Sequence, residues 1–192
     1  MEEAAGGLTG GIGMNRVIVV GTSGSGKTVL AKELSRRMGA VHIEMDRLYW
    51  DPGWAPSEEF EERVRQAVAQ ERWTLCGNYR AVSHIVFPRA DTLIWLDYPM
   101  SLVFMRALWR TIRRVITREP LWGGNRETIT KSFLSKDSIL MWVIQTWRIR
   151  RRDYPKVIKG PMCAHMKVVR LRSQHQTDAW LKQLSPTDPG SS

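Results

Sequence analysis

The sequence predicts an α/β fold, with a five-stranded parallel sheet that carries helices on both faces and a small helical lid. Three observations predict it. Short apolar runs alternate along the chain with segments of helical periodicity. A glycine-rich turn directly follows the first apolar run. A length of 192 residues, 43% of them hydrophobic, suits a single domain with a substantial core.

Five short runs are predicted as strands because they are apolar or β-branched and end at turn residues. They cover residues 16–20, 41–44, 73–76, 92–96 and 167–171. Helices are predicted where apolar residues recur every three or four positions, as Leu30, Leu34 and Met38 do. The predicted helices cover residues 28–38, about 57–70, about 101–118, about 137–152 and 177–184.

Both ends of the chain are predicted to be disordered. Residues 1–13 are rich in glycine and lack periodicity, and residues 185–192 have the composition of a linker. The folded domain is therefore predicted to span residues 14–184. Within it, the stretch 119–125 is rich in residues that break helices and separates two basic helical segments. Residues 106–135 are accordingly predicted to form the lid.

The excess positive charge is concentrated in about a quarter of the chain. The formal net charge is +10. Residues 106–156 contain 13 Lys and Arg against 4 Asp and Glu, a balance of +9, whereas residues 1–105 contain 11 against 13, a balance of −2. The basic segment is predicted to face an anion, either the phosphates of a nucleotide or the backbone of a nucleic acid.

Several classes of protein are disfavoured by the sequence. Cys76 and Cys163 lack metal-ligand spacing and are too few for a disulfide framework, so both are predicted to be buried or free thiols. No apolar run approaches the ~18–20 residues that a membrane span needs. The acidic N-terminus lacks the apolar region of a secretory signal. The protein is therefore predicted to be cytoplasmic and free of membrane, as a monomer or a homodimer.

The glycine-rich turn has the pattern G-x-x-x-x-G-K-T between a strand and a helix, which is the context that a phosphate-binding loop requires. Glycines let backbone N–H groups approach phosphate oxygens, and the helix N-terminus adds partial positive charge. Lys27 is predicted to reach the β- and γ-phosphates of ATP, and the Thr28 hydroxyl to bind Mg²⁺. The predicted nucleotide-binding residues are Gly21, Thr22, Ser23, Gly24, Ser25, Gly26, Lys27 and Thr28.

Two carboxylates follow predicted strands and are candidates for chemistry. Asp97 ends the run TLIWL, as an aspartate that binds Mg²⁺ does, although it could equally shape the turn before Pro99. Asp46 lies just beyond the second strand, where open α/β sheets bind ligands. It is predicted to take the proton of an acceptor hydroxyl or to orient the acceptor. The alternative is that Asp46 pairs with a neighbouring base or caps a helical turn.

Arginines recur every fourth residue in the first basic helix and fall near one face. Of these, Arg110 and Arg114 are predicted to stabilise the phosphoryl group during transfer, as part of a closing lid. A solvated basic face is the alternative. Trp50 and Trp54 bracket a Pro-Gly loop close to Asp46, and Trp50 is predicted to flank the acceptor. These two rings could equally clamp the loop.

With these residues in view, the chain resembles the adenylate-kinase-like branch of P-loop kinases, and within it the bacterial topology modulation proteins. The resemblance covers most of residues 14–184. It rests on GTSGSGKT at 21–28, MDRLYWDPGW at 45–54, CGNYR at 76–80 with RADTLIWLDYP at 89–99, and RALWRTIRR at 106–114. It implies Arg80 as the residue that holds an acceptor phosphate. Cys76 stands where the family has an aspartate, which removes a carboxylate near Mg²⁺.

The sequence therefore predicts an enzyme with ATP and Mg²⁺ as cofactors, which transfers the γ-phosphoryl of ATP to a nucleotide or another small acceptor. The alternative is a nucleic-acid-associated ATP-binding protein with a regulatory role, whose binding surface is the basic segment 106–156. No recognised nucleic-acid module is present, so this alternative ranks second. A GTPase ranks third, because no N-K-x-D motif follows the fourth strand.

Overall fold

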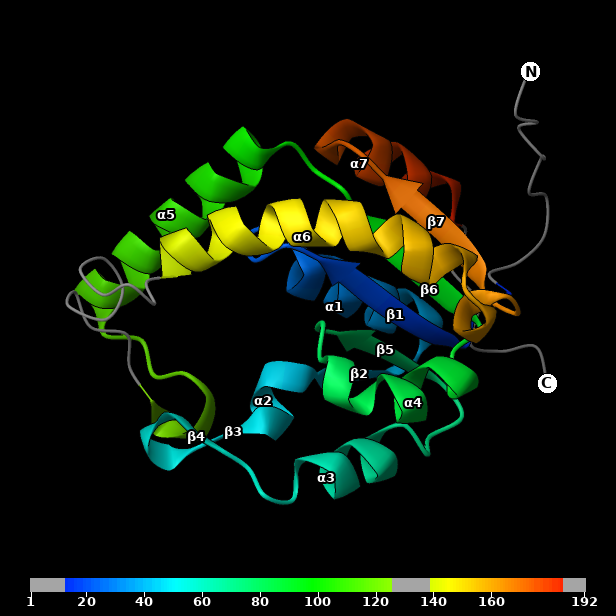
Figure 1. Ribbon diagram of the computed structural model, residues 1–192, viewed down its shortest axis with the longest axis horizontal. Coiled ribbons are helices and arrows are strands. Elements are labelled where there is room, and N and C mark those ends of the chain that lie inside the picture. Colours follow the sequence, from blue (N-terminus) through cyan, green and yellow to red (C-terminus); the bar gives the residue numbers. More distant parts are fainter. Residues whose placement is uncertain (1–12, 126–138, 185–192) are drawn as a thin grey trace.

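The computed structural model describes residues 13–125 and 139–184. All but one residue of the predicted leader, the whole predicted tail and the last third of the predicted lid, residues 126–135, lie outside the described residues. Figure 1 shows a central sheet whose strands are flanked by helices. The strands of the sheet are β1 (Arg16–Gly21), β2 (Val41–Glu44), β5 (Trp73–Cys76), β6 (Thr92–Leu96) and β7 (Lys167–Leu171).

The prediction of a five-stranded parallel sheet is confirmed. The strand order is β2-β5-β1-β6-β7, and every neighbouring pair is parallel. Strand β1 is central, and the register pairs Gly21, its last residue, with Leu96 of β6. The first residue of the glycine-rich loop therefore lies at the carboxyl edge of the sheet, where ligands of such sheets bind.

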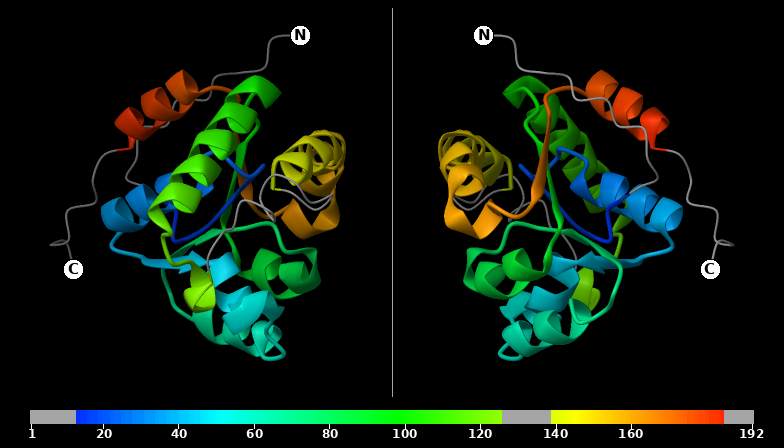
Figure 2. Two further views of the ribbon diagram at one scale, coloured as in Figure 1. Left: turned by 90° about the vertical axis from the view of Figure 1, so that its left-hand side faces the viewer. Right: turned by 90° about the vertical axis from the view of Figure 1, so that its right-hand side faces the viewer.

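Helices cover both faces of the sheet, as Figure 2 shows. On one face lie α1 (Lys27–Met38) and α7 (Gln174–Gln183), and on the other lie α4 (Ser83–Val86) and α6 (Ile139–Lys159). The protein has one hydrophobic core on each face of the sheet. Both include side chains of β1, because successive side chains of a strand point to opposite faces. Val17 and Val19 pack with α1, whereas Ile18 and Val20 pack with α4 and the end of α6.

Two insertions shape the carboxyl edge of the sheet. The first joins β2 to β5 and contains α2 (Met45–Tyr49), β3 (Trp50–Asp51), η1 (Pro52–Trp54), β4 (Ala55–Pro56) and α3 (Phe60–Ala67). The second follows β6 and contains α5 (Met100–Thr117) and η4 (Trp122–Gly124), before the chain enters α6. The remaining short helices are η2 (Arg80–Val82), η3 (Phe87–Arg89) and η6 (Pro161–Cys163).

The helices differ from prediction mainly in extent. Helix α6 continues to Lys159, beyond the predicted end near 152, although Pro155 cannot donate a helical hydrogen bond. Packing explains the extension, since Tyr154, Val157 and Ile158 contact the core on the sheet face that α4 covers. Helices α2 and α4 were not predicted, because five and four residues are too short for a helical period to stand out.

Candidate active site

The glycine-rich loop between β1 and α1 is held tightly against α5. Gly24 has a φ of +87°, a backbone conformation that favours glycine. A Cβ placed on Gly24 would lie 2.3 Å from the Val103 carbonyl oxygen of α5. The loop is closed from within by the Ser25 N–H, which donates to the Thr22 carbonyl at 3.1 Å. Only glycine lets the loop approach α5 this closely, so its backbone amides gather at the start of α1.

Lys27 is half-buried at the first turn of α1 and points back into the loop. Its Nζ donates to the Thr22 carbonyl oxygen at 3.0 Å. Burial lowers the pKa of Lys27 to about 7, and the charge of Arg150 lowers this pKa further. Asp46 has the opposite effect and raises the pKa of Lys27. A lysine held in this way gains its full charge when an anion arrives, which suits a residue that binds phosphate.

We expect nucleotide binding to take up about one proton near pH 8, because phosphate oxygens would raise the pKa of Lys27 well above its value of about 7. Isothermal titration calorimetry in two buffers of different ionisation enthalpy measures this uptake. The Lys27→Met variant should show none.

The same pKa shift determines how the stability of the folded protein depends on pH. The unfolded chain holds the proton up to about pH 10.5, so the stability of the nucleotide-free protein should rise with pH from about 7 to 10.

The loop offers polar groups that fit a nucleotide phosphate and its Mg²⁺. Ser25 Oγ is buried, and in the described part of the chain it has no hydrogen-bond partner, so a phosphate oxygen would satisfy it. The Thr28 hydroxyl lies 3.6 Å from the Cys76 sulfur. Burial raises the pKa of Cys76 to about 11, so it stays a neutral thiol. Residues 13–125 and 139–184 contain no cluster of three His, Cys, Asp or Glu that could hold a metal.

Asp46 is positioned by aromatic residues of two separate segments. The Tyr79 hydroxyl donates to Asp46 Oδ1 at 2.6 Å, and the Trp50 side chain lies near enough to Tyr79 to lower the pKa of its hydroxyl slightly. Burial, and then the charge of Asp46, raises the pKa of Tyr79, so this hydroxyl keeps its proton. Gly77 makes the arrangement possible, since a Cβ there would lie 2.5 Å from Met45 Cβ. The structure thus brings Asp46 and Trp50 together, with Tyr79 between them.

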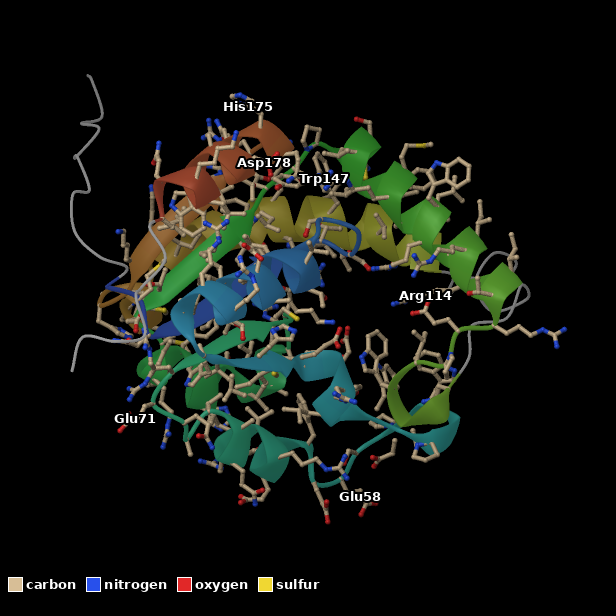
Figure 3. The ribbon with its side chains drawn as sticks, turned by 180° about the vertical axis from the view of Figure 1, so that it is seen from behind. Glu58, Glu71, Arg114, Trp147, His175 and Asp178 are labelled. Carbon is tan, nitrogen blue, oxygen red and sulfur yellow. The ribbon has the colours of Figure 1, made fainter. Side chains whose placement is uncertain are left out.

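The two predicted lid arginines lie at different places. Arg110 reaches the phosphate loop and donates to Ser23 Oγ at 2.9 Å. Arg114 lies one turn further along α5, with its guanidinium 5.7 Å from the centre of the Trp122 ring (Figure 3). Arg110 is therefore already part of the site. The role predicted for Arg114 requires the end of α5 to move toward the nucleotide, and it stays a prediction.

Arg150 of α6 is a site residue that the sequence did not single out. It donates to the Gly21 carbonyl oxygen at 3.2 Å and interacts electrostatically with Lys27 and Asp46. The sequence contained a pattern that could have identified Arg150. Arg150 continues the inward face of α6 that Val143, Thr146 and Tyr154 form, and an arginine on such a face is rarely buried without a partner.

Asp97 is buried in an ion-pair cluster. Its Oδ2 accepts from the Arg170 guanidinium at 2.6 and 3.1 Å, and Arg151 lies 3.6 Å from Oδ1. Arg170 also stacks over the Trp95 ring, at 4.3 Å from its centre. Both oxygens therefore face guanidinium groups, and the cluster joins β6 to β7 and α6. The role in Mg²⁺ binding predicted for Asp97 stays a prediction, which would require water or a rearrangement of these pairs.

The loop that follows α5 docks on the loop that contains the predicted acceptor residues. Asn125 is buried, and its Oδ1 accepts from the Trp54 N–H at 2.9 Å. Its amide nitrogen donates to the carbonyl oxygens of Asp51 and Trp122, at 3.0 and 2.7 Å. The rings of Trp50 and Trp54 meet edge-on at 5.6 Å. This contact joins the described part of the predicted lid to the insertion that carries Asp46.

Some of the basic residues are directed at the site, whereas others, Arg113, Arg148 and Arg152 among them, are exposed. Arg110 and Arg150 contact the phosphate loop, and Arg151 pairs with Asp97. Arg106 donates to Gln174 and stacks over Tyr98. Arg110 and Arg150 are placed where the predicted nucleotide phosphates would bind, and both the nucleotide and the nucleic-acid partner stay predictions. In the described part of the chain, no helix combines the length and apolar character that crossing a bilayer requires.

Comparisons with known proteins establish the fold. No family model matches the chain. The uncharacterized protein YqaC of Bacillus subtilis (strain 168) is 26% identical over 125 residues, which cover 63% of this chain and 70% of that protein. Shikimate kinase from Bacteroides thetaiotaomicron superimposes with a TM-score of 0.50 at 15% identity, over 89% of this chain and 96% of that one.

A second solved structure gives the same result. Shikimate kinase from Acinetobacter baumannii, solved in complex with shikimate, has a TM-score of 0.53 at 15% identity, over 90% of this chain and 92% of that one. The predicted resemblance to P-loop kinases is thereby confirmed for the fold. The likeness to topology modulation proteins stays a prediction. The chain has the fold of small-molecule P-loop kinases.

Proposed function

We propose that the chain is an ATP-dependent phosphotransferase that transfers the γ-phosphoryl of ATP to a small acceptor. The observation that carries the proposal is Lys27, which is held against the glycine-rich loop and interacts electrostatically with Asp46, Arg110 and Arg150. A cation beside a phosphate-binding loop, with a carboxylate nearby, is what phosphoryl transfer requires. A cytoplasmic location would supply the ATP.

Each of these residues would have a role that follows from its position in the site. Lys27 and the backbone amides of the loop would hold the donor phosphates, and Arg110 and Arg150 would stabilise the charge that spreads over the phosphoryl oxygens. Arg114 would join them when the lid closes. Asp46, oriented by Tyr79, would take the proton of the acceptor hydroxyl. Arg80 is proposed to face the acceptor.

Mg²⁺ bound to the phosphates would neutralise part of their charge, and the Thr28 hydroxyl is the protein group placed to hold it. The residues present fit such an ion, because Mg²⁺ in nucleotide sites takes most of its ligands from phosphate and water. Cys76 offers a neutral thiol where a carboxylate would add a further charge. The protein therefore relies on the nucleotide for most of the metal's ligands.

The test is a coupled assay of ADP release from Mg-ATP, run with and without a panel of nucleoside monophosphates, polyols and other alcohols. We expect release that depends on an acceptor and that disappears in the Lys27→Met variant. Failure of the wild-type protein to bind ATP in a calorimetric titration would refute the proposal. ATP binding with tight binding of duplex DNA at low salt, and no turnover, would instead favour the nucleic-acid alternative.

A further inference from the structure

A cavity of about 460 Å³ adjoins the proposed catalytic centre. It lies on the sheet face covered by α4 and α6, which Figure 1 shows in front of β1 and β5. Gly77, Tyr79 and Arg150 border both the cavity and the centre around Asp46. The volume falls within the range of about 300–1,000 Å³ that small-molecule sites occupy. A ligand in the cavity would therefore have one end beside Tyr79 and Arg150, which connect the cavity to Asp46.

The wall of this cavity is mainly apolar. Ten of its twenty lining residues are aliphatic, methionine or phenylalanine, and they come from the sheet as well as from both covering helices. The side chains farthest in sequence from the phosphate loop include Leu75, Val82, Val86, Phe87, Val157 and Met162. Nine further lining residues are polar or charged, but the exposed wall is predominantly apolar. Most hydroxyls of a sugar acid or polyol would therefore be left unpaired, which would oppose the binding of such an acceptor.

The polar residues around the cavity are largely engaged with the protein. Asn78 Oδ1 accepts from the Tyr154 hydroxyl at 2.7 Å and from the Gly21 N–H at 3.2 Å. The Asn78 amide nitrogen donates to the Gly21 carbonyl at 2.6 Å. These bonds hold the wall to the phosphate loop, and they occupy groups that would otherwise recognise a polar ligand.

The guanidinium groups at the cavity have carboxylates in their surroundings. Arg150 interacts electrostatically with Asp46, and Arg80 with Asp153. Asp153 also accepts from Arg152 at 2.8 Å. A nucleoside monophosphate would bring two further negative charges to this end of the site. It would therefore compete with carboxylates that are already in place for the same guanidinium groups.

We propose that the phosphoryl acceptor is an uncharged alcohol with an apolar body, which occupies this cavity with its hydroxyl directed at Asp46; the proposal rests on the proposed function. A lone pair of the alcohol oxygen forms the new bond to the γ-phosphorus of ATP. The bond from that phosphorus to the β–γ bridging oxygen breaks, and its electron pair leaves with ADP. The hydroxyl proton passes to the Asp46 carboxylate. The products are an alkyl or aryl-alkyl phosphate and ADP.

The experiment compares kcat/KM for geraniol and phenylethanol with that for adenosine monophosphate, gluconate and shikimate, using the full-length protein and Mg-ATP. We expect the apolar alcohols to exceed the polar and anionic acceptors by about 10²-fold. A polar or anionic acceptor with the highest kcat/KM would overturn the inference while leaving the kinase proposal standing. Loss of ATP binding in the wild-type protein would instead overturn the kinase proposal.

A variant at the mouth of the cavity provides the control. Ile149 lines the cavity yet is 47% exposed, so Ile149→Glu should fold and should place a charge beside the apolar acceptor. We expect it to raise the KM for geraniol about tenfold, whereas Ile116→Glu, at an exposed position on α5, should leave that KM unchanged. Equal effects of the two substitutions would contradict the assignment.

If no acceptor is turned over, the proposal is tested by measuring the binding of the alcohol. The thermal unfolding midpoint is then measured with geraniol in the presence of a non-hydrolysable ATP analogue. A rise that Ile149→Glu abolishes supports an apolar ligand in this cavity. No rise in the wild-type protein, at concentrations up to the solubility of the alcohol, overturns the proposal.

Discussion

Replacing Lys27 with methionine is expected to lower kcat for phosphoryl transfer by about 10³-fold or more, because it removes the cation proposed to hold the β- and γ-phosphates. Methionine fills a similar volume but has neither charge nor donors, so the surrounding packing is preserved. The variant should also lose proton uptake on nucleotide binding. Steady-state kinetics with saturating Mg-ATP measures the first effect, and calorimetry measures the second.

The same substitution should stabilise the nucleotide-free protein at neutral pH. Burial lowers the pKa of Lys27 to about 7, which means that keeping its charge in this position opposes folding at and below that pH. Lost activity together with a higher unfolding midpoint would therefore identify Lys27 as a functional rather than a structural residue. Lys32→Met is the matched control, because Lys32 is exposed on the same helix and should change neither quantity. Normal turnover by Lys27→Met would refute the assignment.

The parts of the molecule that could be predicted from sequence are those that local chemistry determines. Each strand of the sheet is a short apolar run that ends in turn residues, so all five were predicted within one residue of their observed bounds. The phosphate-binding loop combines glycine, lysine and threonine within eight residues, between a strand and a helix. Such patterns are complete within one segment and do not depend on how distant segments meet.

Contacts between distant segments could not be predicted in the same way. Arg150 follows Gly21 by 129 residues and reaches it only because α6 crosses the sheet above the phosphate loop. Tyr79 was noted only as part of the stretch CGNYR, and its bond to Asp46 depends on the path of the chain through α2. Sequence places Asp97 at the end of a strand, but the guanidinium groups of Arg151 and Arg170 that face it come from two other elements.

The second large effect is expected at Asp46. Asp46→Asn should reduce kcat by about 10²- to 10⁴-fold, the range that loss of a general base produces. Asparagine is nearly isosteric and its Oδ1 still accepts from the Tyr79 hydroxyl, so the position of the side chain is retained. The loss should therefore fall on kcat and leave the KM for the acceptor nearly unchanged. Asp51→Asn is the control, because Asp51 lies in the same insertion and pairs with Arg63 away from the centre.

The electrostatic role of Asp46 can be separated from its role as a base. Because the charge of Asp46 raises the pKa of Lys27, Asp46→Asn should lower that pKa below about 7. Proton uptake on ATP binding would then extend to lower pH than in the wild-type protein. If Asp46 acted only through Lys27, lowering the pH would restore the charge of Lys27 and with it most of kcat. A loss of kcat that persists at low pH, with ATP binding restored, identifies Asp46 as the group that takes the acceptor proton.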